Sequence, residues 1–116
     1  MEKIKDMNLR KMLLELEEML QRVYGNKLKA VILYGSVARG TATEESDIDI
    51  MVLVDGTAQE LRTFEDQLSD VSTDISIKYF RVFSIIDISY QEYMRWVNTS
   101  PFSRNVSKEG VILYAA

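Results

Sequence analysis

Four residues of this chain combine reactive or phosphate-binding side chains with a regular spacing. Gly35 and Ser36 follow an apolar run, AVILY, and Asp47 and Asp49 open a second run, in which IMVLV follows the last aspartate. Side chains alternate between the two faces of a strand, so both aspartates project from the same face. Two such carboxylates can hold a divalent cation, and a glycine turn can hold phosphate. The pattern therefore indicates phosphoryl or nucleotidyl transfer.

Mg²⁺ fits this pair of aspartates, which we call the acidic dyad. Proteins usually hold Mg²⁺ through one or two carboxylates and leave its remaining positions to waters and substrate phosphates. Gly35 lets backbone N–H groups approach phosphates, Ser36 adds a hydroxyl donor, and Arg39 adds a charged, forked donor. The residues expected to bind nucleotide in this phosphate loop are Gly35, Ser36, Arg39 and Gly40.

A purely structural role is the alternative for each piece taken alone. A Gly-Ser pair after a strand is often only a turn, an Asp-x-Asp motif arises by chance, and a single loop arginine is usually solvated. The combination resists that explanation, because two same-face aspartates at the start of a strand repel one another unless a cation lies between them. The loop matches neither the Walker A motif nor the Rossmann glycine motif, which excludes ATPases and dehydrogenases of those types.

The segment GSVARGTATEESDIDIMVLV (residues 35–54) resembles the nucleotidyltransferase pattern of the DNA polymerase β superfamily, whose small stand-alone members are the minimal nucleotidyltransferases. The N-terminal helix and the closing segment PFSRNVSKEGVILY (residues 101–114) are similar to that group too. The resemblance implies an α/β fold: a polymerase-β-like palm with a mixed sheet of three to four strands flanked by helices. It also implies Mg²⁺, with room for two ions, and ATP or another NTP as cosubstrate. The implied reaction transfers a nucleoside monophosphate to a hydroxyl and releases pyrophosphate.

The same resemblance implies a protein partner. Many stand-alone members are encoded beside small helical HEPN proteins that act as RNase toxins, and some silence these toxins by adding adenylate groups. We therefore expect this chain to be the antitoxin of such a pair, transferring AMP to a protein hydroxyl or another acceptor, within a homo- or hetero-oligomer. The alternative is a catalytically weak or inactive nucleotide-binding subunit that neutralises or regulates its partner by binding.

A third carboxylate usually completes the metal site in this superfamily, on the neighbouring strand, where it also accepts the proton of the attacking hydroxyl. Asp87, within the apolar stretch VFSIIDI, is our candidate, so the expected catalytic and metal-binding set is Asp47, Asp49 and Asp87. Asp74 competes, but it falls on the polar side of an expected helix. Asp87 reaches the dyad only if the two strands are antiparallel. If they are parallel, it lies about five residues, roughly 16 Å, too far along, and a position near residues 80–81 faces the dyad instead.

Composition restricts the chemistry further. The 116 residues fit one nucleotidyltransferase domain over 1–116, and they contain neither cysteine nor histidine, so catalysis has to run on carboxylates, metal and positioning. The net charge of −4 and a pI near 4.8 argue against a grip on long nucleic acid. No apolar run is long enough to span a bilayer, and the first residues show no secretory pattern, so we expect a cytoplasmic protein.

Periodicity predicts the elements that position these residues. Apolar residues recur at helical spacing over 6–24, with Gly25 as the stop, and again over 57–79. Ser89 with Glu92 resembles the capping box of another helix, and Ser100-Pro101 opens a last one that ends at Gly110. The remaining expected elements are a strand at 30–34, a short helix at 37–39, strands at 48–54 and 82–88, and an edge strand or extended tail at 111–114.

Overall fold

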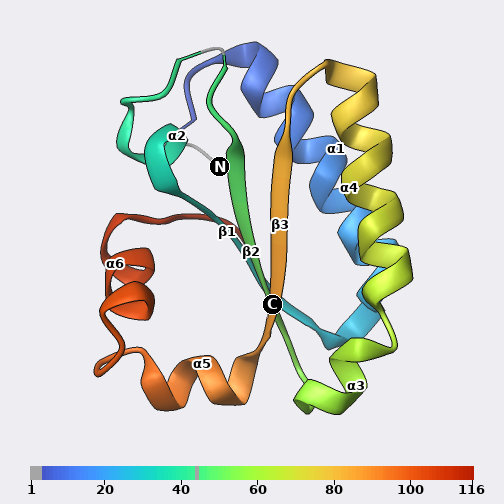
Figure 1. The fold of residues 1–116 in the computed structure, drawn as a ribbon, viewed down its shortest axis with the longest axis vertical. Helices are drawn as coiled ribbons and strands as arrows, with labels where there is room; N and C mark the ends of the chain where they lie inside the picture. The colour runs from blue at the N-terminus through green and yellow to red at the C-terminus, as the bar shows by residue number, and fades with distance from the viewer. Residues whose placement is uncertain (1–3, 44) are drawn as a thin grey trace.

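The computed structural model describes residues 4–43 and 45–116, which contain a four-stranded sheet in the order β3-β2-β1-β4 (Figure 1). β1 is antiparallel to both β2 and β4, and β2 is parallel to β3. The expected α/β fold with a mixed sheet flanked by helices is therefore confirmed. The strands are β1 (Leu28–Tyr34), β2 (Ile48–Val54), β3 (Phe83–Ser89) and β4 (Val111–Ala115).

Helices α1 (Met7–Tyr24) and α4 (Glu65–Tyr79) cover one face of the sheet, to the right of the strands in Figure 1. Their apolar stripes form the larger core with the alternate residues of β2 that point the same way. The fully buried side chains of this core include Leu13, Leu16, Leu20, Ile48, Ile50 and Val52. This packing confirms that the N-terminal stripe serves the core, as its spacing predicts.

The helix expected over 57–79 is two helices. α3 (Ala58–Arg62) begins at Thr57, whose hydroxyl and Glu60 form a capping box, and it ends before α4 starts at Glu65. Between them, the Phe64 ring lies 4.8 Å from the ring of Tyr24, centroid to centroid. This aromatic contact ties the break to the end of α1. The sequence pattern did not predict the break between α3 and α4, because the apolar residues keep helical spacing across both segments.

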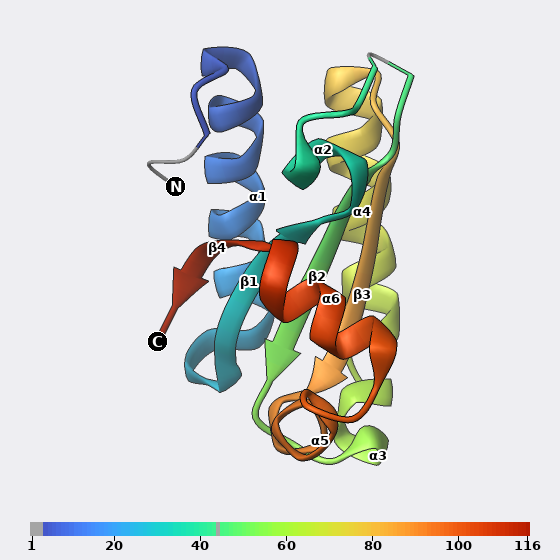
Figure 2. The ribbon, with the colours of Figure 1, turned by 90° about the vertical axis from the view of Figure 1, so that its left-hand side faces the viewer.

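Helices α2 (Gly35–Arg39), α5 (Tyr90–Trp96) and α6 (Pro101–Glu109) lie on the opposite face, at the left of Figure 1. A smaller core under α5 and α6 covers the part of this face where β2 ends; it contains Ile32, Met51, Leu53, Tyr93 and Val106. α2 lies beyond this cover, near the start of β2 (Figure 2). The polar residues at the start of β2 thus stay accessible, while the rest of the strand is buried.

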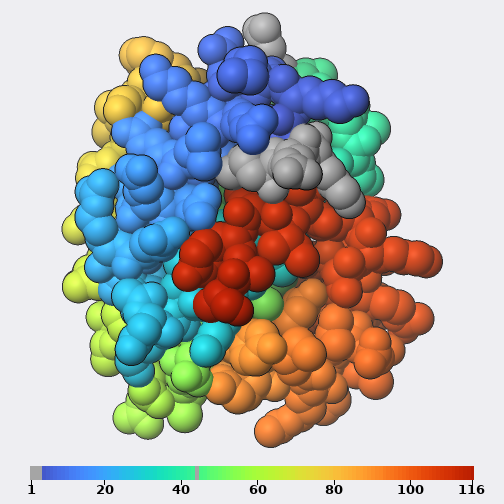
Figure 3. Space-filling model, turned by 180° about the vertical axis from the view of Figure 1, so that it is seen from behind, coloured from blue at the N-terminus to red at the C-terminus, as the bar shows by residue number. Residues whose placement is uncertain are grey.

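The C-terminal segment forms the edge strand β4, which confirms the first of the two forms expected for it. β4 pairs with β1, and on the molecular surface β4 lies beside α1 (Figure 3). Gly110 joins α6 to β4 and passes so close to β1 that an added Cβ would lie 2.7 Å from Ile32 Cγ2. α6 is therefore seated directly on the sheet. No helix of residues 4–43 and 45–116 combines the length and the apolar character that crossing a membrane requires.

Phe80 is the one non-glycine residue with positive φ in the part of the chain described, at +53°, and its side chain is 93% exposed. A left-handed conformation costs an L-residue about 1–2 kcal/mol, whereas glycine adopts it without this strain. A glycine variant recovers only part of this energy, because glycine loses more conformational entropy on folding. We predict that Phe80→Gly stabilises the protein by about 0.5–1 kcal/mol, measured by urea denaturation. A loss of stability would show that the exposed ring contributes packing that its exposure conceals.

Gly25, which follows the end of α1 as Phe80 follows the end of α4, supplies the matched control. Its φ is +58° with ψ −133°, and an added Cβ would meet no atom within 4 Å, so backbone strain alone opposes a side chain. Gly25→Ala should therefore destabilise the protein by about 1 kcal/mol or more. Opposite signs for the two substitutions would locate the strain in the backbone and not in lost contacts.

Candidate active site

The phosphate loop and the acidic dyad meet at one end of the sheet. Tyr34, the last residue of β1, pairs with Asp49 of β2, and the chain turns at Gly35 into α2. Gly35 has a φ of +75°, and a Cβ at this position would clash with Oδ2 of Asp49. The turn therefore requires glycine for two reasons, its backbone angle and the carboxylate beside it. The two sequence motifs lie in direct contact.

The dyad carries negative charge that its protein surroundings compensate only in part. Asp47 is exposed at the mouth of β2, and Asp49 is half-buried. Burial raises the pKa of the Asp49 carboxyl, the nearby Asp47 raises this pKa further, and Arg39 opposes both. Two oxygen donors with excess negative charge suit a hard divalent cation such as Mg²⁺. Within residues 4–43 and 45–116, no group of three or more His, Cys, Asp or Glu side chains is placed to hold a metal.

The rest of the phosphate loop presents its donors next to this carboxylate. The backbone carbonyl of Ser36 accepts from the N–H groups of Gly40 and Thr41, which closes the loop, and Gly40 ends α2 in a left-handed conformation. The Ser36 hydroxyl makes no hydrogen bond to any residue that the structure describes. Arg39 forms an ion pair with Glu109 of α6, with 3.6 Å between Nη1 and Oε2, and both side chains remain about half exposed. The serine hydroxyl and the exposed guanidinium can therefore still reach a phosphate.

Asp87 does not join the dyad, which corrects the expected three-carboxylate set. The strands β2 and β3 are parallel, and Asp87 pairs with Val52, three positions or about 10 Å beyond the pair formed by Asp49 and Ser84. Because three positions is an odd number, Asp87 also projects from the opposite face of the sheet. There its Oδ2 accepts a 3.0 Å hydrogen bond from the hydroxyl of Tyr24.

The position on β3 that faces the dyad is Ser84. The register expected for a parallel pair, with residues 80–81 opposite the aspartates, is therefore wrong by about three positions. Residues 80 and 81 form the turn that follows α4, and β3 begins only at Phe83. The register between β2 and β3 depends on the length of the turn after α4, and an apolar pattern does not show that length.

Arg81 supports the chain beside Asp47, a role that the sequence analysis did not assign to it. Its Nη2 donates to the carbonyl of Ser46 over 3.2 Å, and the next residue, Val82, accepts from the N–H of Ile48. These two hydrogen bonds hold the chain on either side of Asp47. The signal in the sequence was a single basic residue just before the third strand, which has no specificity without the parallel register.

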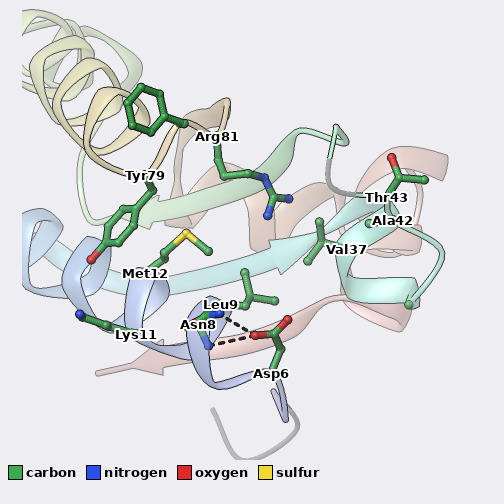
Figure 4. A pocket seen from close by; sticks show the side chains of 12 residues that line it. Asp6, Asn8, Leu9, Lys11, Met12, Val37, Ala42, Thr43, Tyr79 and Arg81 are labelled. Atoms are coloured by element: carbon green, nitrogen blue, oxygen red, sulfur yellow. Dashed lines mark hydrogen bonds between the residues drawn. The ribbon is translucent and has the colours of Figure 1, made fainter.

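Two hollows border the loop on different sides. The larger, about 730 Å³, is lined by residues of α1, the loop after α2 and the turn after α4, among them Leu9, Val37 and Arg81 (Figure 4). Neither aspartate of the dyad lines it. The smaller, about 240 Å³, lies between α2 and α6 and includes Tyr34 and Gly35, which adjoin Asp49. Neither aspartate lines this hollow either, but Tyr34 pairs with Asp49 and Gly35 lies against its carboxylate, so the smaller hollow borders the dyad.

The chain belongs to the polymerase β nucleotidyltransferase family, since the family model described as "Polymerase beta, Nucleotidyltransferase" matches residues 14–116. It is a nucleotidyltransferase by this membership and by its relatives. A candidate protein adenylyltransferase of Methanocaldococcus jannaschii is 38% identical over 108 residues, which cover 93% of this chain and 100% of the relative.

Solved structures share the fold at lower identity. A toxin–antitoxin crystal structure with AMP-PNP aligns with a TM-score of 0.57 and 21% identity, over 88% of this chain and 73% of the other. The complex of a tri-AMPylated HEPN toxin from Shewanella oneidensis with its MNT antitoxin gives a TM-score of 0.59 and 16% identity, over 92% and 72%. These likenesses agree with the expected palm-like sheet.

The raised pKa of Asp49 predicts a stability cost in the metal-free protein. A carboxyl whose pKa is raised by folding keeps its proton to higher pH in the folded state than in the unfolded chain, so stability falls as pH rises between the two values. We predict that Asp49→Asn stabilises the protein in EDTA at about pH 7, and that the gain disappears near pH 3.5, below the pKa of about 3.9 of an unfolded aspartate. Thermal unfolding at both pH values measures this difference.

Asp74→Asn is the control for this measurement, because Asp74 lies exposed on α4, away from the dyad. It should leave the melting temperature nearly unchanged at both pH values. If Asp49→Asn destabilised the metal-free protein at neutral pH, the carboxylate would be making a favourable contact instead of bearing an uncompensated charge.

Proposed function

We propose that this chain transfers AMP from ATP, with Mg²⁺, to a hydroxyl group of a helical partner protein of the HEPN type. The contact between Gly35 and the Asp49 carboxylate carries this proposal, because it brings a phosphate-binding turn and a cation-binding dyad to the same place. The names of the relatives support the finer statement: one is a candidate protein adenylyltransferase, and one structural neighbour holds an AMPylated HEPN toxin. The neighbour with AMP-PNP supports an adenine nucleotide as the donor.

Each residue of the site has a proposed role. Asp47 and Asp49 hold Mg²⁺, which when bound neutralises triphosphate charge and polarises the α-phosphate. The backbone at Gly35 and the hydroxyl of Ser36 bind the outer phosphates, and Gly40 shapes the loop. Arg39 leaves Glu109 for the triphosphate, a stronger anion offering forked acceptors. These contacts fix the phosphorus for attack, which is the principal way that a site without a covalent nucleophile lowers the barrier.

In the proposed reaction, the acceptor oxygen forms a bond to the α-phosphorus while the bond from that phosphorus to the bridging oxygen of the β-phosphate breaks. Pyrophosphate leaves with the electron pair of the broken bond. The acceptor proton passes to water or to a group of the partner, because the β3 position facing Asp49 is Ser84 and no third carboxylate joins the dyad within the described residues. The same feature favours the second candidate function, a subunit that binds nucleotide and regulates its partner with little transfer.

The test is transfer of label from α-³²P-ATP to a HEPN-type protein encoded beside this chain, with and without Mg²⁺. We expect Mg²⁺-dependent labelling of the partner, located by mass spectrometry as an added AMP on a hydroxyl side chain. Mg²⁺-dependent ATP binding with no labelled partner would support the regulatory subunit instead. Failure to bind ATP in the presence of Mg²⁺ would contradict both functions.

Two aspartate variants form a matched pair for this assay. Asp47→Asn removes one of two carboxylate ligands, so Mg²⁺-dependent ATP affinity should fall by at least about tenfold to a hundredfold, and labelling should fall with it. Asp87→Asn should keep both within about twofold of the unmodified protein, since Asp87 lies on the other face, where asparagine can still accept from Tyr24. Equal losses in both variants would contradict the proposed site, which contains Asp47 and excludes Asp87.

A further inference from the structure

The hollow of about 240 Å³ between α2 and α6 adjoins the acidic dyad, although neither aspartate lines it. One wall comes from the phosphate loop and the strand before it, through Tyr34, Gly35 and Arg39. Tyr34 pairs with Asp49, and Gly35 lies against the Asp49 carboxylate. A nucleotide with its α-phosphate at the dyad therefore has its nucleoside within reach of this hollow.

The other wall is one face of α6. Phe102, Asn105, Val106 and Glu109 all line the hollow, and their spacing of three, four and seven residues places them on one side of the helix. The rings of Tyr34 and Phe102 are in edge-to-face contact, with 5.7 Å between their centroids, so together they form one aromatic wall of the hollow. Phe102 is nonetheless 48% exposed, so its ring still offers apolar surface. The hollow thus has one aromatic wall, and the buried Val106 side chain adds further apolar surface to its lining.

Charge and size select the part of a nucleotide that fits. Arg39 and Glu109 face each other as an ion pair, so the rim carries almost no net charge, and Glu109 repels a phosphate once Arg39 has turned to the triphosphate. Pockets for whole drug-sized molecules measure about 300–1,000 Å³, so this hollow is too small for a complete nucleotide. A neutral planar base matches the volume of the hollow and can pack against its aromatic wall.

We infer that this hollow is the nucleobase subsite of the transferase and that Asn105 selects adenine; this inference rests on the proposed function. The Asn105 amide makes no hydrogen bond to any other described residue, so its donor and its acceptor are both available. An asparagine amide pairs with adenine through N6 and N7, donating to one atom and accepting from the other. Guanine presents two acceptors at the same edge and leaves the amide oxygen without a donor.

The test compares ATP with GTP, in equilibrium binding and in transfer, for the full chain with Mg²⁺. The unmodified protein should favour ATP over GTP by roughly tenfold or more, and Asn105→Ala should reduce this ratio to near one. Binding of Mg²⁺-tripolyphosphate, which has no base, should not change. Phe102→Ala should weaken ATP and GTP alike and leave tripolyphosphate unaffected, because it removes a wall and not the polar group that reads the base.

Asn98→Ala is the matched control, since Asn98 is exposed after α5 and does not line the hollow. An unchanged ATP to GTP ratio in Asn105→Ala, or equal effects from Asn98→Ala, would overturn the inference. The binding arm separates this failure from failure of the proposed function. If no partner is labelled but ATP selectivity still depends on Asn105, the nucleobase subsite is supported and AMP transfer to the partner is contradicted. If labelling depends on Asp47 but selectivity is indifferent to Asn105, the transferase stands and the subsite falls.

Discussion

The close approach of the Gly35 backbone to the Asp49 carboxylate is the constraint on which the site depends. It couples two strands: β1 has to end where β2 begins, and the antiparallel register that pairs Tyr34 with Asp49 ensures this. The apolar runs on both strands secure that register, since a shift of one residue would turn the buried side chains of β2 to the wrong face. The core thus positions the chemistry, although none of its residues takes part in it.

The dyad exchanges stability for binding capacity. Burial and the nearby Asp47 raise the pKa of Asp49, and Arg39 only partly balances the negative charge of the dyad. A fold selected for stability alone would place a neutral residue there, which supports the proposed role of the dyad in binding a cation. Asp87 makes the contrast clear: it too sits in an apolar strand, but the Tyr24 hydroxyl satisfies it within the fold, so it requires no cation.

Local patterns predicted what local physics determines. The strands, the helix ends at Gly25 and Gly110, and the placement of the phosphate loop beside the dyad follow from alternation, capping and one glycine turn. The relative direction of β2 and β3 does not, because an apolar run such as that of β3 reads the same in either direction. The error over Asp87 comes from this unknown, whereas the error in the register near residues 80–81 comes from the unknown length of the turn between α4 and β3. Asn105 and Glu109 of α6 were missed because a surface helix of polar residues carries no sign of what it faces until β4 seats it on the sheet.

The way in which α6 is attached has a mechanical consequence. One wall of the small hollow continues directly from β1, and the other leads through Gly110 into β4, which is hydrogen-bonded to that same strand. The two walls of the hollow are therefore attached to adjacent, hydrogen-bonded strands of the sheet. In the proposed transferase, the pairing of β1 with β4 therefore sets the separation between the two walls of this hollow.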